Sequence, residues 1–176
     1  MNMREGQQLL LPANPLFIWG SLLAALALNM AQNMGLWGRA AWVPDLLACV
    51  LVFWSVHQPQ RIGMVAAFVF GLAMDVHTSS LLGQHALAYT VMSFLAIAIH
   101  RRLLWFSVPS QALQVLPLFL AAHLIELLVR MLAGGQFPGV FMLAAPFIEA
   151  LLWPVVSILL LVPQRRAPDP DANRPL

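Results

Sequence analysis

The chain contains no lysine and few charged side chains of any kind. All nine of its basic residues are arginine, and charged residues make up 9% of the 176 positions, whereas hydrophobic residues make up 61%. A soluble domain carries about a quarter charged residues, so this composition excludes an ordinary soluble fold. The net charge of +2, with no arginine run longer than two, also argues against nucleic-acid binding.

Cysteine and catalytic motifs are equally scarce. Cys49 is the single cysteine and cannot form an internal disulfide, so we expect it to be a small buried hydrophobe. No segment matches a phosphate loop, a dinucleotide fingerprint, a zinc-protease helix or a nucleophile elbow. We therefore predict that the protein is not an enzyme and needs no cofactor or metal, and an intramembrane enzyme is the least favoured hypothesis.

Long apolar runs fill most of the sequence. They predict an all-α, polytopic integral membrane protein with about six transmembrane helices in one bundle, over 16–36, 46–56, 62–76, 81–99, 112–133 and 140–162. The second and third runs are short, so 46–76 either spans or re-enters, and we favour spanning. Residues 1–15 would form a cytoplasmic segment, 16–162 the transmembrane domain and 163–176 a disordered cytoplasmic tail.

The arginines are distributed unevenly over the predicted connections. With six spans both termini lie on one side, and that side holds Arg4, Arg61, Arg101, Arg102, Arg165, Arg166 and Arg174. The other side holds Arg39 and at most Arg130. Positive charge collects on the cytoplasmic side of membrane proteins, so we predict that both termini are cytoplasmic.

The segment 71–89 places polar side chains between two apolar runs. It contains a carboxylate, an amide and two imidazoles: Asp75, Gln84, His77 and His85. Polar groups without partners are costly inside a membrane, so this cluster needs partners, water or a ligand. Gly71 shares a helix face with Asp75, four residues later, and Gly83 opens the next helix. We expect the nearby Tyr89 to pack in the interior.

Three interpretations of segment 71–89 remain open. In the first, Asp75 and Gln84 cap helix ends and close the turn between two helices. In the second, the segment is an interface or pocket for a partner or ligand, formed by Gly71, Asp75, Gly83, Gln84 and His85. In the third, a metal ion binds the chemically suitable set of Asp75, His77 and His85.

A second polar constellation lies on the fifth predicted helix. His123, Glu126 and Arg130 share one face, and Glu126 precedes Arg130 by four residues, which suits an ion pair. Glu149, alone in the sixth helix, also needs a partner, and Arg130 or the amide face of the first helix are candidates. That face should point into the bundle and consists of Asn29, Gln32 and Asn33. We predict an intramembrane polar network of His123, Glu126, Arg130 and Glu149 in preference to a proton relay.

Short motifs across most of the chain carry a family resemblance. The most specific is Gly71-Leu-Ala-Met-Asp75 followed by 82–89, Leu-Gly-Gln-His-Ala-Leu-Ala-Tyr. Weaker ones include Trp42-Val-Pro44-Asp45 with Phe53-Trp54 and Pro59, His100-Arg101-Arg102, Trp153-Pro154 and Arg165-Arg166. With these motifs the sequence resembles the rod shape-determining protein MreD family of bacterial inner membranes.

The resemblance implies a non-enzymatic scaffold subunit of the elongation (rod) complex, which supports cell shape and lateral peptidoglycan synthesis. Its implied partners are the single-pass MreC, the actin-like MreB, and the wall synthases RodA and penicillin-binding protein 2. It also implies a helical fold similar to the substrate-binding subunits of energy-coupling-factor transporters. The alternative function is therefore a small-molecule-binding or transport subunit. The family supplies no catalytic residues, and Gly71, Asp75, Gly83 and Gln84 match it as a structural or interface motif.

Overall fold

The computed structural model describes residues 13–36 and 42–164, and every regular element in these ranges is helical. The α-helices are α1 (Pro15–Ala31), α2 (Leu46–His57), α3 (Met64–Thr78), α4 (Gln84–Leu103), α5 (Val108–Leu132) and α6 (Ala145–Leu161). A π-helical turn, η1 (Gln32–Leu36), extends α1, and two 3-10 turns, η2 (Val140–Ala144) and η3 (Val162–Gln164), flank α6. The all-α prediction is confirmed. Most of the predicted N-terminal segment and tail lies outside the described residues, as do Arg4, Arg39, Arg165, Arg166 and Arg174.

Among the described residues, three helices are long and apolar enough to cross a bilayer: Pro15–Met34, Val108–Leu132 and Val140–Gln164. α2 and α3 have 12 and 15 residues, which at 1.5 Å per residue gives about 18 Å and 22 Å against a hydrocarbon core of about 30 Å. The chain is thus a polytopic helical membrane protein in which short helices are packed among long ones.

Local sequence explains where the helices begin. α5 begins at Val108, earlier than predicted, because Pro109 fits the first turn of a helix. α4 begins later than predicted, at Gln84, because Gly83 adopts a φ of 103°, which is not a helical conformation. Asp45 is the N-cap of α2, and its side chain accepts a hydrogen bond from the N–H of Ala48. Pro44 therefore lies before this helix.

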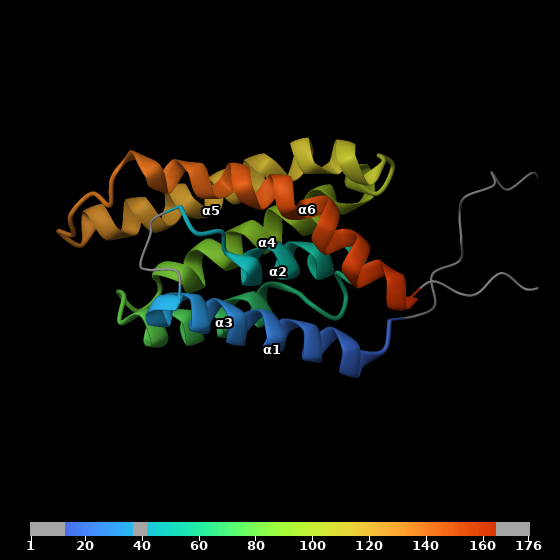
Figure 1. The fold of residues 1–176 in the computed structure, drawn as a ribbon, viewed down its shortest axis with the longest axis horizontal. Coiled ribbons are helices and arrows are strands. Elements are labelled where there is room, and N and C mark those ends of the chain that lie inside the picture. The colour runs from blue at the N-terminus through green and yellow to red at the C-terminus, as the bar shows by residue number, and fades with distance from the viewer. Residues whose placement is uncertain (1–12, 37–41, 165–176) are drawn as a thin grey trace, which may run out of the picture.

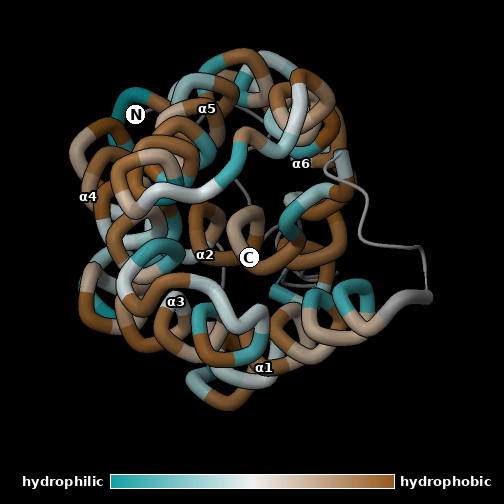
Figure 2. The backbone as a smooth tube through the Cα atoms, turned by 90° about the vertical axis from the view of Figure 1, so that its left-hand side faces the viewer, coloured by the Kyte–Doolittle hydropathy of each residue, from teal (hydrophilic) through white to brown (hydrophobic). Residues whose placement is uncertain are grey.

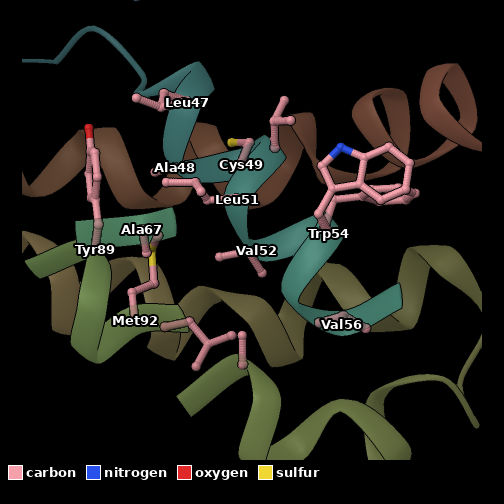
Figure 3. Packing of buried hydrophobic residues seen from close by; sticks show 14 of the residues in the cluster. Leu47, Ala48, Cys49, Leu51, Val52, Trp54, Val56, Ala67, Tyr89 and Met92 are labelled. Atoms are coloured by element: carbon pink, nitrogen blue, oxygen red, sulfur yellow. The ribbon is translucent and has the colours of Figure 1, made fainter. Parts of the chain in front are cut away.

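α2 lies in the middle of the bundle. It packs against α1, α4 and α6, and Figures 1 and 2 show it surrounded by the other helices. All ten residues from Leu47 to Val56 are buried, which is the pattern of a helix that is apolar all round. Figure 3 shows Ala67 of α3 and Tyr89 and Met92 of α4 to one side of α2, in the same buried cluster as its side chains.

The two ends of the bundle differ in what they contain. The described chain starts and finishes at one end, which also holds the α2–α3 and α4–α5 turns (Figure 1). At this end Arg61 donates a hydrogen bond from Nη1 to the carbonyl of Ala13 at 2.9 Å. The α3–α4 turn and the α5–α6 connection lie at the other end. We call these the Arg61 end and the Asp75 end.

Candidate functional site

The side chain of Asp75, in the last turn of α3, is enclosed by the start of α4. Asp75 is 1% exposed. Its carboxylate accepts hydrogen bonds from the N–H groups of Gly83 and His85, both at 2.8 Å, and of Ala86 at 3.3 Å. The hydroxyl of Ser80 at 3.0 Å and Nδ1 of His85 at 2.8 Å complete the set. Asp75 thus supplies the negative charge that the N-terminus of α4 favours, because the N-cap Gly83 has no side chain to offer.

Two glycines make this arrangement possible for different reasons. A Cβ atom built on Gly71 would lie 2.3 Å from Cα of Ala86 and 2.6 Å from its nitrogen, so α3 approaches α4 backbone to backbone. Gly83 has open space around it, but its φ of 103° is a conformation that other residues rarely adopt. One glycine permits close packing and the other permits the turn that returns the chain to Asp75.

The remaining polar residues of segment 71–89 do not join one site. Nε2 of His77 lies 3.2 Å from the carbonyl of Met30, so this ring faces α1. In the described part of the chain, no group of three or more acidic, histidine or cysteine side chains is placed to hold a metal ion. Gln84 is buried, but its amide takes no part in the hydrogen bonds around Asp75. The geometry therefore matches the turn-closing interpretation for Asp75, though not for the Gln84 side chain.

A second and larger polar site centres on Asp45, at the start of the buried helix α2. Oδ1 of Asp45 accepts from Nδ2 of Asn29 at 2.7 Å and from the N–H of Ala48 at 2.9 Å, and Oδ2 accepts from the hydroxyl of Tyr89. The carbonyl oxygen of the Asn29 side chain in turn accepts from the N–H of Leu46 at 3.2 Å. α1, α2 and α4 are thus tied together through one carboxylate.

Glu149 of α6 extends the Asp45 site to two further helices. Its Oε1 accepts from the backbone N–H of Asp45 at 2.9 Å and lies 3.5 Å from Nε2 of His123 in α5. The opposite ring nitrogen of His123 lies 3.0 Å from the carbonyl of Phe119. Glu149 is fully buried, and its Oε2 has no hydrogen-bond partner among the described residues. We call Asn29, Asp45, Tyr89, His123 and Glu149 the Asp45 network.

The predicted His123–Glu126–Arg130–Glu149 network is brought together in part. His123 and Glu149 are neighbours, as described above. Within the described residues, Glu126 and Arg130 form no salt bridge, although Glu126 lies within electrostatic range of His85, His123 and Arg130. The stem of Arg130 instead lies beside the α5–α6 turn, where a Cβ on Gly135 would approach its Cγ to 2.7 Å. Arg130 is therefore not the partner of Glu149, whereas Asn29 of the amide face on the first helix reaches Glu149 indirectly through Asp45.

Sequence reasoning did not identify Asp45 and Tyr89 as network members. Tyr89 packs in the interior, as predicted, and Asp45 caps its own helix. The sequence does contain one indication that Tyr89 belongs to a polar site. Tyr89 is the lone tyrosine and lies in a membrane segment, where a buried hydroxyl needs a hydrogen-bond acceptor. Chemically, the Asp45 network and the Asp75 turn hold helices together through buried, charge-assisted hydrogen bonds.

Comparison with known proteins gives a consistent result. The family model for rod shape-determining protein MreD matches residues 13–166. A curated relative, the rod shape-determining protein MreD of Haemophilus influenzae, is 28% identical over 148 residues, which cover 81% of this chain and 89% of the relative. No solved structure matches the chain.

Proposed function

The chain belongs to the rod shape-determining protein MreD family, and from this premise we propose that it is a non-enzymatic scaffold subunit of the bacterial elongation (rod) complex. In this role it would reside in the inner membrane and support cell shape and lateral peptidoglycan synthesis. A single-pass MreC-like protein would bind to its helices, with MreB, RodA and penicillin-binding protein 2 as neighbours in the complex. The family assignment itself places the chain in the system that determines rod shape.

One structural observation carries the scaffold proposal: Asp45, Asp75 and Glu149, acids that could have served chemistry, form bonds between helices. Asp75 receives five hydrogen bonds from the α3–α4 turn and the start of α4, and the Asp45 network joins α1, α2, α4, α5 and α6. Such bonds give a bundle a single arrangement of its helices. A rigid bundle with few extramembrane residues presents mainly helix faces to its partners, which is what a membrane scaffold needs.

The proposed orientation has both termini in the cytoplasm. Arg61, Arg101 and Arg102 lie at the Arg61 end together with both ends of the described chain. Arg130 lies near the Asp75 end. This division of charge supports the positive-inside assignment for the described residues. Reporter fusions to the carboxyl terminus that are active outside the cytoplasm would contradict it.

The scaffold proposal is tested by photocrosslinking from the lipid-facing surface in living cells. A photoreactive amino acid replaces one exposed residue on each of four helices: Leu16 on α1 (81% exposed), Val65 on α3 (79%), Leu113 on α5 (76%) and Leu151 on α6 (77%). These side chains are largely exposed, so the fold should persist. The negative control is a photoreactive amino acid of leucine's size at the buried Leu51 of α2, because a larger one would overpack the core. Crosslinked products are identified by mass spectrometry from native membranes.

We expect at least one exposed position to capture a single-pass MreC-like protein or a wall synthase, while Leu51 captures neither. The proposal fails if no position yields a wall-synthesis protein and the purified protein instead carries a bound metabolite. That second outcome would favour the alternative of a small-molecule-binding or transport subunit.

A further inference from the structure

The charges of the described residues are separated along the bundle. Asp75 and Glu126 belong to the second halves of α3 and α5, toward the Asp75 end, whereas Asp45 and Glu149 meet inside the bundle. Arg61 lies in the α2–α3 turn, and Arg101 and Arg102 lie in the last helical turn of α4, all at the Arg61 end. No salt bridge in the described part of the chain involves these three residues. The Arg61 end therefore carries cationic charge that these residues leave uncompensated.

Two of these three arginines lie where α4 ends. Arg101 and Arg102 are exposed in its last turn. After the buried Leu103, three apolar side chains are also exposed: Leu104 (46%), Trp105 (90%) and Phe106 (43%). We call these five exposed residues, Arg101, Arg102, Leu104, Trp105 and Phe106, the Arg–Trp turn. Two guanidinium groups, an indole and a phenyl ring are thus exposed within six consecutive residues.

The Arg–Trp turn has a defined backbone. The N–H groups of Leu104, Trp105 and Phe106 donate to the carbonyls of His100, Arg102 and Leu103 at 3.0–3.2 Å. Leu103 is fully buried, and Nε2 of the buried Gln111 donates to the carbonyl of Phe106 at 3.0 Å. Inward-facing groups thus fix the turn while its arginines and aromatic rings project outward.

The position of α5 sets the depth of this turn in the membrane. α5 is long and apolar enough to cross a bilayer and begins at Val108, so residues 101–106 lie where the chain meets the headgroup region. Tryptophan is enriched at this level because its ring is amphipathic. Arginine guanidinium groups pair with phosphate through two parallel hydrogen bonds.

We propose that the Arg–Trp turn is a binding site for the headgroup of an anionic phospholipid. Arg101 and Arg102 bind the phosphate, and Trp105 and Phe106 lie against the glycerol and upper acyl chains. The exposed apolar residues favour a lipid over a soluble protein partner, because a ring that is 90% exposed beside a membrane-crossing helix is already positioned at the bilayer surface. The inference does not depend on the scaffold role.

The test uses the full-length purified protein in detergent, titrated with dioleoylphosphatidylglycerol or with the zwitterionic dioleoylphosphatidylcholine and followed by native mass spectrometry. Each basic residue near an anionic membrane surface increases the affinity for that surface by about fivefold. Arg101→Gln and Arg102→Gln should each weaken phosphatidylglycerol binding about fivefold, and the double variant roughly thirtyfold. Arg130→Gln removes the same charge at the Asp75 end and should leave this affinity unchanged.

A double Arg101→Lys, Arg102→Lys variant keeps the charge and should keep most of the preference for phosphatidylglycerol. Circular dichroism of every variant checks that helix content is unaltered. The proposal is overturned if the wild type binds the two lipids equally. It is also overturned if the double glutamine variant retains wild-type phosphatidylglycerol binding or loses affinity for both lipids alike. Loss of rod shape by that variant with lipid binding intact would assign the turn to a protein partner instead.

Discussion

A methyl group on Gly71 would lie 2.3 Å from Cα of Ala86, so α3 and α4 touch backbone to backbone at this point. The close approach is also what brings Asp75, one helical turn later, within hydrogen-bond distance of the first N–H groups of α4. Packing and polar bonding at the α3–α4 corner are thus consequences of the same missing side chain.

Gly71→Ala should therefore destabilise the protein. The atoms in the way belong to the backbone of α4, which cannot rotate aside, so the helices must separate. Overpacking of this kind costs about 1–3 kcal/mol, measurable as a lower free energy of unfolding in a denaturant titration of the detergent-solubilised protein. Gly20→Ala is the matched control, since a Cβ there meets nothing within 4 Å. Equal stability of the two variants would show that the helices are not in close contact at Gly71.

Asp75→Asn should also destabilise, although the two side chains have the same shape. Both oxygens of Asp75 accept hydrogen bonds, Oδ1 from His85 and Ser80 and Oδ2 from Gly83 and Ala86. The NH₂ group of asparagine cannot accept a hydrogen bond, so it would face one of these two sets of donors and leave them without an acceptor. Each buried donor left unpaired costs about 1–3 kcal/mol. The free energy of unfolding measures the loss.

Ser80→Ala is the control for the Asp75 variant because it removes a single donor and leaves the carboxylate with the other four. Its effect should stay below about 1.5 kcal/mol, the upper end for one ordinary hydrogen bond. If Asp75→Asn were as mild as Ser80→Ala, the cap on α4 would contribute little, and Asp75 would be free for a partner or ligand.

Tyr89 and Asp45 should show a measurable energetic coupling. The hydroxyl of Tyr89 donates to Oδ2 of Asp45 across the interface of α4 and α2. Tyr89→Phe and Asp45→Ala each remove that bond, and the double variant removes it once. A double-mutant cycle on the free energy of unfolding should give a coupling of about 1–3 kcal/mol. A coupling near zero would place the two side chains apart in the folded protein.

The helical fold and the Asp75 turn were predictable from the sequence for a shared reason: both depend on residues close together in the chain. Apolar runs define helices locally, and Asp75, Gly83 and His85 lie within eleven positions of one another. The turn-closing interpretation of Asp75 was therefore one of three that spacing and side-chain chemistry allow. Favouring it required the bonds that the carboxylate receives from the start of α4 and the direction of the His77 ring, which faces α1.

Which residues pair in the Asp45 network could not be predicted, because its bonds join residues far apart in the chain. Tyr89 is 44 positions from Asp45, and Glu149 is 104 positions away. Which helices neighbour α2 depends on the packing of the whole bundle, which no local pattern specifies. The expected Glu126–Arg130 pair illustrates the same limit, since i, i+4 spacing permits an ion pair but the packing of the α5–α6 turn draws the Arg130 stem toward Gly135.

The hydrogen bond from the N–H of Asp45 to Glu149 makes the role of Glu149 testable with two substitutions. Glu149→Gln keeps a carbonyl oxygen that can accept from Asp45, and its amide nitrogen can take the place of Oε2, which has no partner among the described residues. Its effect on the free energy of unfolding should stay within about 1 kcal/mol. Glu149→Leu leaves the Asp45 N–H buried without an acceptor and should cost about 1–3 kcal/mol.

Glu126→Gln is the control for loss of an acid and should have little effect, because the Glu126 side chain has no hydrogen bond in the described part of the chain. If leucine were tolerated as well as glutamine, the link between α2 and α6 would depend on apolar packing alone.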